Sequence, residues 1–365
     1  MEDSERRKRR HYAREIERRE QERRGKERER REREKRRRQR AIRRQRAILA
    51  GAAAAAILLI WGVTAIRAER KEAQEQRQEE AAQAAAAARE AQEQEERQEQ
   101  EAQDQEAMEK TMTSLESTVE SLVSDYNGSW SVYVEELEYK NDFSINNQGM
   151  YPASLVKLFA MAATFENMEQ VLENETDYMG SETSARDTVA QLLENMIEIS
   201  DNESYNELVK LQSSDRDFAE GCYLINAYLQ EEGYTGTGVH TTLHPAVSST
   251  ANDGLGDNVT CAEDCGALLE KIYKGTCSSQ EDSGEMLHLL LDQENTLKIP
   301  GGLPEGVEVA HKTGETSEVQ HDVGIVYGEE TDFILCIMID EVTNAASVYT
   351  QIHELTETVY EALNN

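Results

Sequence analysis

The sequence has few of the features that metal and nucleotide sites require. Its seven histidines show no metal-ligand spacing, and Cys261 and Cys265 have no further Cys or His at the distances that zinc sites use. No glycine-rich phosphate-binding loop is present. These absences exclude the zinc and nucleotide motifs that a sequence can reveal, so we predict an activity without metal or cofactor.

The remaining cysteines and histidines also indicate structural roles. The cysteine count is five, and an odd count leaves at least one unpaired even where disulfides can form. Cys336 lies inside an apolar run and is predicted to be a buried strand residue. His311 and His321 are expected to be structural as well.

Positive charge is concentrated at the start of the chain. Residues 1–46 contain 23 Lys or Arg against 11 Asp or Glu, a net charge of +12, whereas residues 47–365 have a net charge of −45. Residues 5–46 have almost no apolar positions, so they cannot form a core. A basic segment of this kind binds nucleic acid or anionic lipid, and the apolar run that follows it favours lipid.

A single apolar run follows the basic segment. Residues 47–66 contain no charged side chain and are long enough to cross a bilayer once as a helix. A cleaved signal peptide has a shorter charged start and a shorter apolar segment, so we predict a retained transmembrane helix. Since basic flanks stay in the cytoplasm, we expect a single-pass protein of the cell membrane whose remaining chain lies outside.

Residues 67–111 lack Pro, Gly and, before Met108, any large apolar residue. Glu, Gln, Ala and Arg are strong helix formers, but here they make no apolar stripe. A true coiled coil is disfavoured because heptad positions lack Leu, Ile or Val. We predict a polar helical stalk, with a disordered linker as the alternative.

Residues 112–365 have the composition of one globular domain. Alternation of apolar and polar residues predicts a first strand at 130–139 with a hairpin partner at 142–150. Helices are expected from 154 to about 219 and beyond. The end of the domain predicts strands at 320–327 and 332–340 and a closing helix at 345–363. Strands at both ends of a helical region indicate an α+β fold, an antiparallel sheet flanked by helices.

Ser154 and Lys157 lie three residues apart at an expected helix start, because Pro152 suits a first turn and an apolar run follows. Residues at this spacing share a helix face, and unpaired N–H groups there favour negative charge. A lysine whose pKa is lowered by burial or by a nearby cation can accept the serine proton. The alternative is a helix cap and a solvated lysine.

Two further short motifs lie in the same domain. Ser200-Asp201-Asn202 falls on a turn between helices, where it could simply be a helix cap. Lys312-Thr313-Gly314 lies on or beside a strand, where its lysine could be an ordinary edge residue. Three such motifs in this order within one domain arise by coincidence about one time in twenty.

With these motifs in place, residues 115–363 resemble the penicillin-recognising serine enzymes, and among them the class A β-lactamases. The adjoining stretches 310–314 and 322–326, and a helix expected at 260–273, belong to the same resemblance. It implies a serine hydrolase or acyltransferase that forms an acyl-enzyme with a β-lactam or a peptidoglycan-type peptide.

The resemblance also implies a role for each site residue. Ser154 is the nucleophile and Lys157 its proton acceptor, while Ser200 passes a proton to the leaving amine and Asn202 orients Lys157. The implied oxyanion site consists of the backbone N–H groups of Ser154 and Glu315. Substrate binding is implied for Lys312, which also acts as a cation beside Lys157, together with Thr313, Gly314 and Glu315.

One element of class A enzymes is missing. Their deacylating water is activated by the glutamate of a Glu-x-x-x-Asn pattern, and none occurs between Glu203 and Lys312. The acids at 240–260 are Asp253 and Asp257, in a glycine-rich stretch. This favours slow deacylation, as in a penicillin-binding D,D-peptidase or an esterase-like relative.

The sequence leaves two other functions open. A non-hydrolysing penicillin-binding or sensor protein of the cell envelope would keep the acylation groups without turnover. A structural envelope protein would depend on residues 1–110 instead. The Glu315 carboxylate is a further consideration, because it disfavours a substrate anion unless its side chain points out of the pocket.

Overall fold

The computed structural model describes residues 73–244 and 251–364 and, before them, Lys8, His11, Glu15, Arg18, Ile57 and Leu58. The chain divides into two units, Met1–Ala91 and Gln92–Asn365, and the second contains the sheet and all the helices from residue 156 onward. In the described residues, no helix is both long and apolar enough to cross a membrane. Apart from the six single residues, the predicted basic segment 1–46 and the predicted span 47–66 lie outside the described part.

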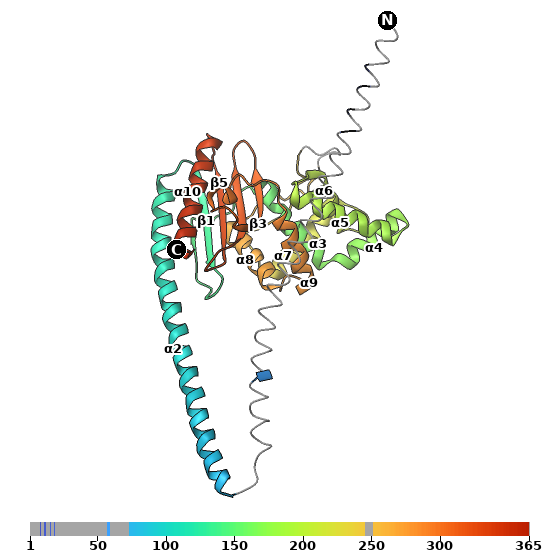
Figure 1. The fold of residues 1–365 in the computed structure, drawn as a ribbon. Coiled ribbons are helices and arrows are strands. Elements are labelled where there is room, and N and C mark those ends of the chain that lie inside the picture. The colour runs from blue at the N-terminus through green and yellow to red at the C-terminus, as the bar shows by residue number, and fades with distance from the viewer. Residues whose placement is uncertain are drawn as a thin grey trace. The chain divides into compact units, whose positions relative to one another are not determined.

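Helices make up most of the described chain, and five strands form its sheet (Figure 1). The strands are β1 (Ser129–Glu136), β2 (Asp142–Ile145), β3 (Glu308–Glu315), β4 (Gln320–Tyr327) and β5 (Phe333–Asp340). The helices are α2 (Ala73–Asp125), α3 (Val156–Glu166), α4 (Met168–Met179), α5 (Glu182–Glu198), α6 (Asn202–Leu211), α7 (Phe218–Glu232), α8 (Ala262–Lys274), α9 (Gln280–Leu291) and α10 (Ala345–Asn364). Two short 3-10 turns are η1 (Ala153–Leu155) and η2 (Ile299–Gly302).

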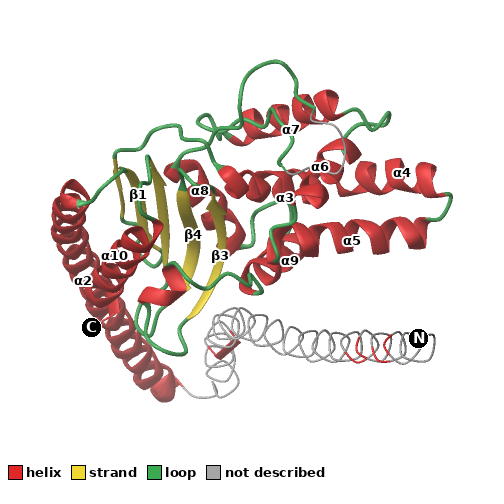
Figure 2. Ribbon diagram, turned by 90° about the horizontal axis from the view of Figure 1, so that it is seen from above, coloured by secondary structure: helices red, strands yellow, loops and turns green. Residues whose placement is uncertain are grey.

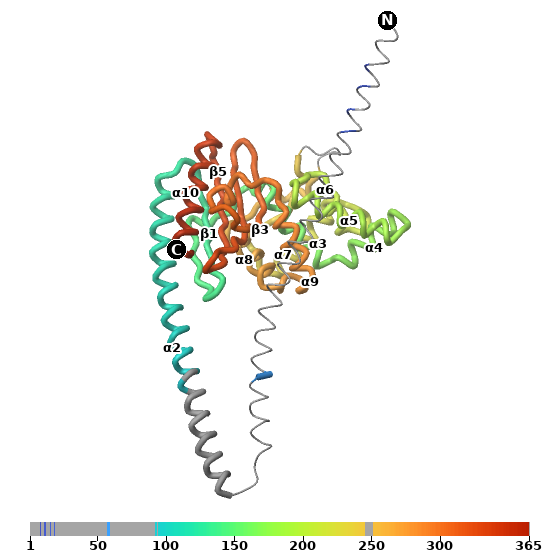
Figure 3. The backbone as a smooth tube through the Cα atoms, in the orientation of Figure 1, coloured from blue at the N-terminus to red at the C-terminus, as the bar shows by residue number. Residues whose placement is uncertain are grey.

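The sheet is antiparallel throughout, with the strand order β2-β1-β5-β4-β3. Figure 3 shows the chain leave the sheet after β2, pass through the helices and return at β3. The sheet is therefore assembled from both ends of the domain, and the predicted α+β fold with an antiparallel sheet is confirmed.

Both faces of the sheet are covered. In β5 the odd-numbered residues from Phe333 to Ile339 join a core with α2 and α10, whereas Ile334, Cys336 and Met338 join the core with α3 and α8. A strand that is buried on both faces reads as a continuous apolar run, which is what residues 333–339 show. Figure 2 shows helices α3 to α7 and α9 gathered on the side of β3, so β3 faces the helical region.

The first hairpin is shorter than predicted. β1 ends at Glu136 instead of 139, because the Glu136 carboxylate accepts hydrogen bonds from the backbone N–H of Tyr139 at 3.0 and 3.1 Å and closes a turn. β2 ends at Ile145 instead of 150, because Asn146 has a φ of 51°, which a strand does not allow. The predicted ends of both strands are therefore wrong.

Helix α2 includes residues 73–111 of the predicted stalk and continues unbroken to Asp125. Its last turns pack on the sheet through Met112, Leu115, Val119 and Val123. The change in composition near residue 112 thus falls inside a helix, at the point where one face begins to be buried.

All five cysteines lie in the described part of the chain, and all are free and buried. Cys336 is fully buried in β5, as predicted. Burial raises the pKa of Cys277 to about 11 and that of the other four above its usual value as well, so the thiols are poor nucleophiles at neutral pH.

Candidate active site

Ser154 lies in the short turn η1, immediately before α3. The turn is closed by the backbone N–H of Leu155, which donates to the Pro152 carbonyl at 3.0 Å. Ala153 has a φ of 46°, an unusual value for a residue with a side chain. The predicted helix start is therefore correct to within one turn, and the turn holds Ser154 at the N-terminus of α3.

Helix α3 buries Lys157. Every residue from Val156 to Phe165 is buried, because the helix is apolar on all sides. The Lys157 amine lies 3.0 Å from the Ser154 hydroxyl oxygen. The sequence alternative of a solvated lysine is thereby excluded.

Two acceptors fix the Lys157 amine. It donates to the Ser200 carbonyl at 2.6 Å and to the Asn202 amide oxygen at 2.7 Å. The Asn202 amide nitrogen donates to the His244 carbonyl, which supports this orientation of the amide. A neutral amine has two N–H groups and one lone pair, so both N–H groups are engaged and the lone pair is left for a hydroxyl.

Burial also allows the Lys157 amine to act as a base near neutral pH. Burial, and then the positive charge of Lys312, lowers the pKa of Lys157 to about 6. At neutral pH the amine is therefore mostly uncharged. The expected contribution of Lys312 is present, but it is the smaller of the two causes.

Ser200 lies between the two lysines. Its hydroxyl oxygen is 3.1 Å from the Lys157 amine and 2.9 Å from the Lys312 amine. Ser200 has a φ of 58°, a strained value for a serine, and this turn between α5 and α6 directs its side chain into the site. Of the residues in this motif, Asp201 is the helix cap: its carboxylate accepts from the Ser204 N–H at 2.6 Å, and α6 begins at the next residue.

Strand β3 brings the third motif to the other two. The buried Lys312 amine donates to the Ser200 hydroxyl and, at 3.0 Å, to the Thr313 carbonyl. Burial lowers the pKa of Lys312 to about 7. The three motifs predicted from sequence therefore form one hydrogen-bonded group.

Gly314 sets the distance between β3 and η1. A Cβ atom at this position would lie 2.7 Å from the Pro152 carbonyl oxygen and 3.2 Å from the Leu155 nitrogen. Only glycine lets the strand approach the nucleophile turn this closely. The Glu315 N–H belongs to the next residue of the strand segment that packs against this turn.

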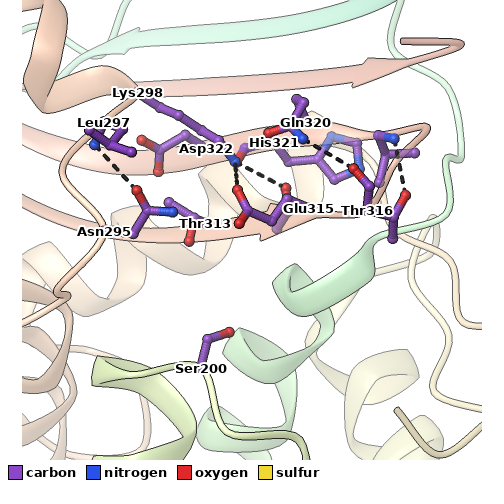
Figure 4. A network of polar contacts seen from close by, with 12 residues as sticks. Ser200, Asn295, Leu297, Lys298, Thr313, Glu315, Thr316, Gln320, His321 and Asp322 are labelled. Atoms are coloured by element: carbon purple, nitrogen blue, oxygen red, sulfur yellow. Dashed lines mark hydrogen bonds and ion pairs between the residues drawn. The ribbon is translucent and has the colours of Figure 1, made fainter. Parts of the chain in front are cut away.

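Lys298 is a site residue that the sequence did not predict. This fully buried lysine precedes η2, and its amine donates to the carbonyls of His321 at 3.0 Å and Gly314 at 3.3 Å. It also forms an ion pair with the Glu315 carboxylate at 3.1 Å (Figure 4). The structure thus settles the direction of the Glu315 side chain, which is turned toward Lys298. No spacing in the sequence links these two residues.

His321 connects the sheet to the nucleophile turn. Its Nδ1 accepts from the Ile339 N–H at 3.0 Å, so Nε2 bears the proton and donates to the Tyr151 carbonyl at 2.9 Å. Burial lowers the pKa of His321 to about 4, which keeps the ring neutral. His311 pairs with Asp322 at 2.8 Å, and both are buried. Both histidines have structural contacts, as expected.

Of the two acids in the 240–260 stretch, Asp253 is engaged with a histidine. The Asp253 carboxylate lies 2.7 Å from His240 Nδ1 and is engaged there. Residues 245–250 lie outside the described part of the chain.

The penicillin-recognising serine enzymes have an antiparallel sheet in which a Lys-Thr-Gly strand lies beside a Ser-x-x-Lys turn. The fold and the site described above define this class, and within it the β-lactamase type. A sequence model of the beta-lactamase enzyme family matches residues 114–363. The chain belongs to this family, and its enzymes are serine hydrolases. No curated protein matches the chain significantly.

Solved structures share the fold. PBP-A is 21% identical and covers 69% of this chain and 96% of its own, with a TM-score of 0.55. One PBP-A mutant was solved as the acyl-enzyme complex with penicillin G. The extended-spectrum β-lactamase TLA-1 is 18% identical, covering 70% of this chain and 99% of its own with a TM-score of 0.57. A β-lactamase from Sphaerobacter thermophilus DSM 20745 is also 18% identical, covering 69% and 97% with a TM-score of 0.55.

Proposed function

We propose that this protein forms an acyl-enzyme at Ser154 with a β-lactam or a peptidoglycan-type peptide. The observation that carries the proposal is the contact of 3.0 Å between the Ser154 hydroxyl and the buried Lys157 amine. Because two carbonyl oxygens take the N–H groups of that amine, its lone pair is left for a hydroxyl, and Ser154 at 3.0 Å and Ser200 at 3.1 Å are the two within reach.

In the acylation step, the Ser154 oxygen attacks the substrate carbonyl carbon and its proton passes to Lys157. The negative charge that develops on the carbonyl oxygen is held by the N–H groups of Ser154 and Glu315, which are fixed before the reaction begins. When the carbonyl–nitrogen bond breaks, Ser200 gives its proton to the leaving nitrogen and takes up the proton that Lys157 accepted, across the 3.1 Å contact between them. Lys312, at 2.9 Å from Ser200, supports this transfer and binds the substrate with Thr313.

Gly314→Ala is expected to reduce acylation about a hundredfold, because the added methyl group forces β3 away from η1 and moves the Glu315 N–H out of position. The rate of covalent labelling by penicillin G measures this effect. The matched control is Gly284→Ala in α9, where a Cβ atom meets nothing within 4 Å. Equal labelling of both variants would contradict the proposed position of the Glu315 donor.

The acylation rate is expected to rise with pH, with a midpoint near pH 6. Below this value Lys157 is protonated and cannot accept the serine proton; above it the amine is neutral. The rate constant at saturating penicillin G, measured across the range, gives the midpoint.

Lys312→Met provides the control for this assignment. Removing the Lys312 charge removes one of the two causes that lower the pKa of Lys157, so the midpoint should move to higher pH. A midpoint that stays fixed or moves down would exclude Lys157 as the titrating base.

A non-hydrolysing penicillin-binding or sensor protein is the second candidate. It is favoured by the absence of the Glu-x-x-x-Asn pattern and by the engagement of Asp253 with His240. Mixing the full-length chain with penicillin G and following both protein mass and free product separates the two. A lasting adduct without product supports the binding protein, whereas steady product formation supports the hydrolase.

We also propose that the protein is anchored in the cell membrane by residues 47–66, with residues 1–46 in the cytoplasm against anionic lipid and the enzyme domain outside. The charge and apolar pattern of the sequence supports this. Protease added to intact cells should then digest the enzyme domain. Its protection from the protease would contradict this orientation.

A further inference from the structure

Four charged side chains surround the end of β3 that borders Ser154. Lys298, Lys312 and Asp322 are fully buried, whereas the Glu315 side chain is 48% exposed. The two cations and two carboxylates balance, and Glu315, which Figure 4 shows beside Lys298, is the member of the four that is exposed.

Lys298 has no donor to offer a ligand. Its ammonium has three N–H groups, and it has three acceptors, the carbonyls of His321 and Gly314 and the Glu315 carboxylate. Its charge is countered by the Asp322 carboxylate and then by that of Glu315. Lys298 is therefore a support of β3 whose donors are already engaged.

Lys312 is the cation left for a ligand, and the Glu315 charge weakens its attraction for an anion. In the described part of the chain, Lys312 donates to the Ser200 hydroxyl and the Thr313 carbonyl, which leaves its third N–H for the substrate. Besides burial, three charges act on the pKa of Lys312, in decreasing order: Asp322 raises it, Lys298 lowers it and Glu315 raises it. A substrate carboxylate at Lys312 would meet attraction from Lys312 and repulsion from Glu315 together.

We propose that Glu315 makes this site select acyl donors that bring an uncharged or cationic group toward Lys312 over those that bring a carboxylate. The inference rests on the proposed acylation of Ser154 and defines its substrate class. Penicillins carry a carboxylate next to the reacting ring, so they are the disfavoured kind. Neutral esters and amidated or amine-bearing peptides are the favoured kind.

The test compares penicillin G with its methyl ester, two probes that differ in this one charge. For each variant of the full-length chain, the acylation rate with the acid is divided by the rate with the ester. Glu315→Gln, which keeps an acceptor for Lys298, should raise this ratio about tenfold. Because the ratio is taken within one variant, a general loss of activity or folding cancels.

Glu318→Gln is the matched control, because Glu318 is an exposed carboxylate in the following turn. Its ratio should stay within about twofold of the parent chain. An unchanged ratio in Glu315→Gln, or an equal rise in both variants, would overturn the inference alone. The absence of any adduct with either probe would instead overturn the acyl-enzyme function and this inference with it.

Discussion

Ser154→Ala is expected to lose covalent labelling by penicillin G, with the acylation rate falling at least about a thousandfold. The variant has no oxygen to form the ester, and the mechanism uses the Ser200 hydroxyl, between two lysine amines at 2.9 and 3.1 Å, for proton transfer and not for attack. The loss removes only a hydroxyl group, so the fold should be retained. Intact-mass spectrometry over time measures the rate, and thermal unfolding monitors the fold.

The control for this variant is Ser117→Ala. The Ser117 hydroxyl is exposed on α2 and bonds within its own helix to the Thr113 carbonyl, so the parent labelling rate should be kept. If Ser154→Ala still acquired the adduct at the parent rate, another residue would be the nucleophile.

Lys157→Met is expected to slow acylation by about a hundredfold to ten-thousandfold, the range that a positioned general base contributes. Methionine fills a similar buried volume but cannot accept the Ser154 proton. Ser200 and Asn202 lose the donor that they share, yet the cost of burying an amine disappears as well, so we expect little net change in stability. The labelling rate at saturating penicillin G is the measurement.

A matched lysine lies on α6. Lys210 lies away from the site, where its amine is 2.6 Å from the Glu207 carboxylate. Lys210→Met should therefore keep the parent rate. Labelling of Lys157→Met at the parent rate would mean that a different group accepts the serine proton.

The sheet illustrates what local sequence can predict. β4 has the predicted bounds, because its apolar residues end at Gly328, and β5 begins one residue later than predicted, because its continuous apolar run starts at Phe333. β1 and β2 end earlier than predicted, because their ends depend on a side-chain acceptor, Glu136, and a single left-handed residue, Asn146. Alternation of residue types does not encode either feature.

The contacts in the site also differ in how far local sequence predicts them. Ser154 and Lys157 are neighbours on one helical turn, so local spacing predicts their contact. Ser200 and Lys312 reach them only through the fold, and the sequence suggested their meeting by resemblance.

Lys298 had no signal in the sequence, and for His321 the sequence predicted a structural role but not its partners. Lys298 precedes a 3-10 turn in a stretch without periodicity, and both residues act through backbone carbonyls, which every residue possesses. The direction of the Glu315 side chain depends on Lys298, and it could not be predicted for the same reason.

The most direct test of the acyl-enzyme mechanism is the location of the adduct. The full-length chain is incubated with penicillin G, quenched in acid, digested, and its peptides are sequenced by tandem mass spectrometry. The mechanism predicts the penicilloyl group on Ser154 and on no other residue. An adduct on another side chain, or none with either penicillin G or its methyl ester, would contradict it.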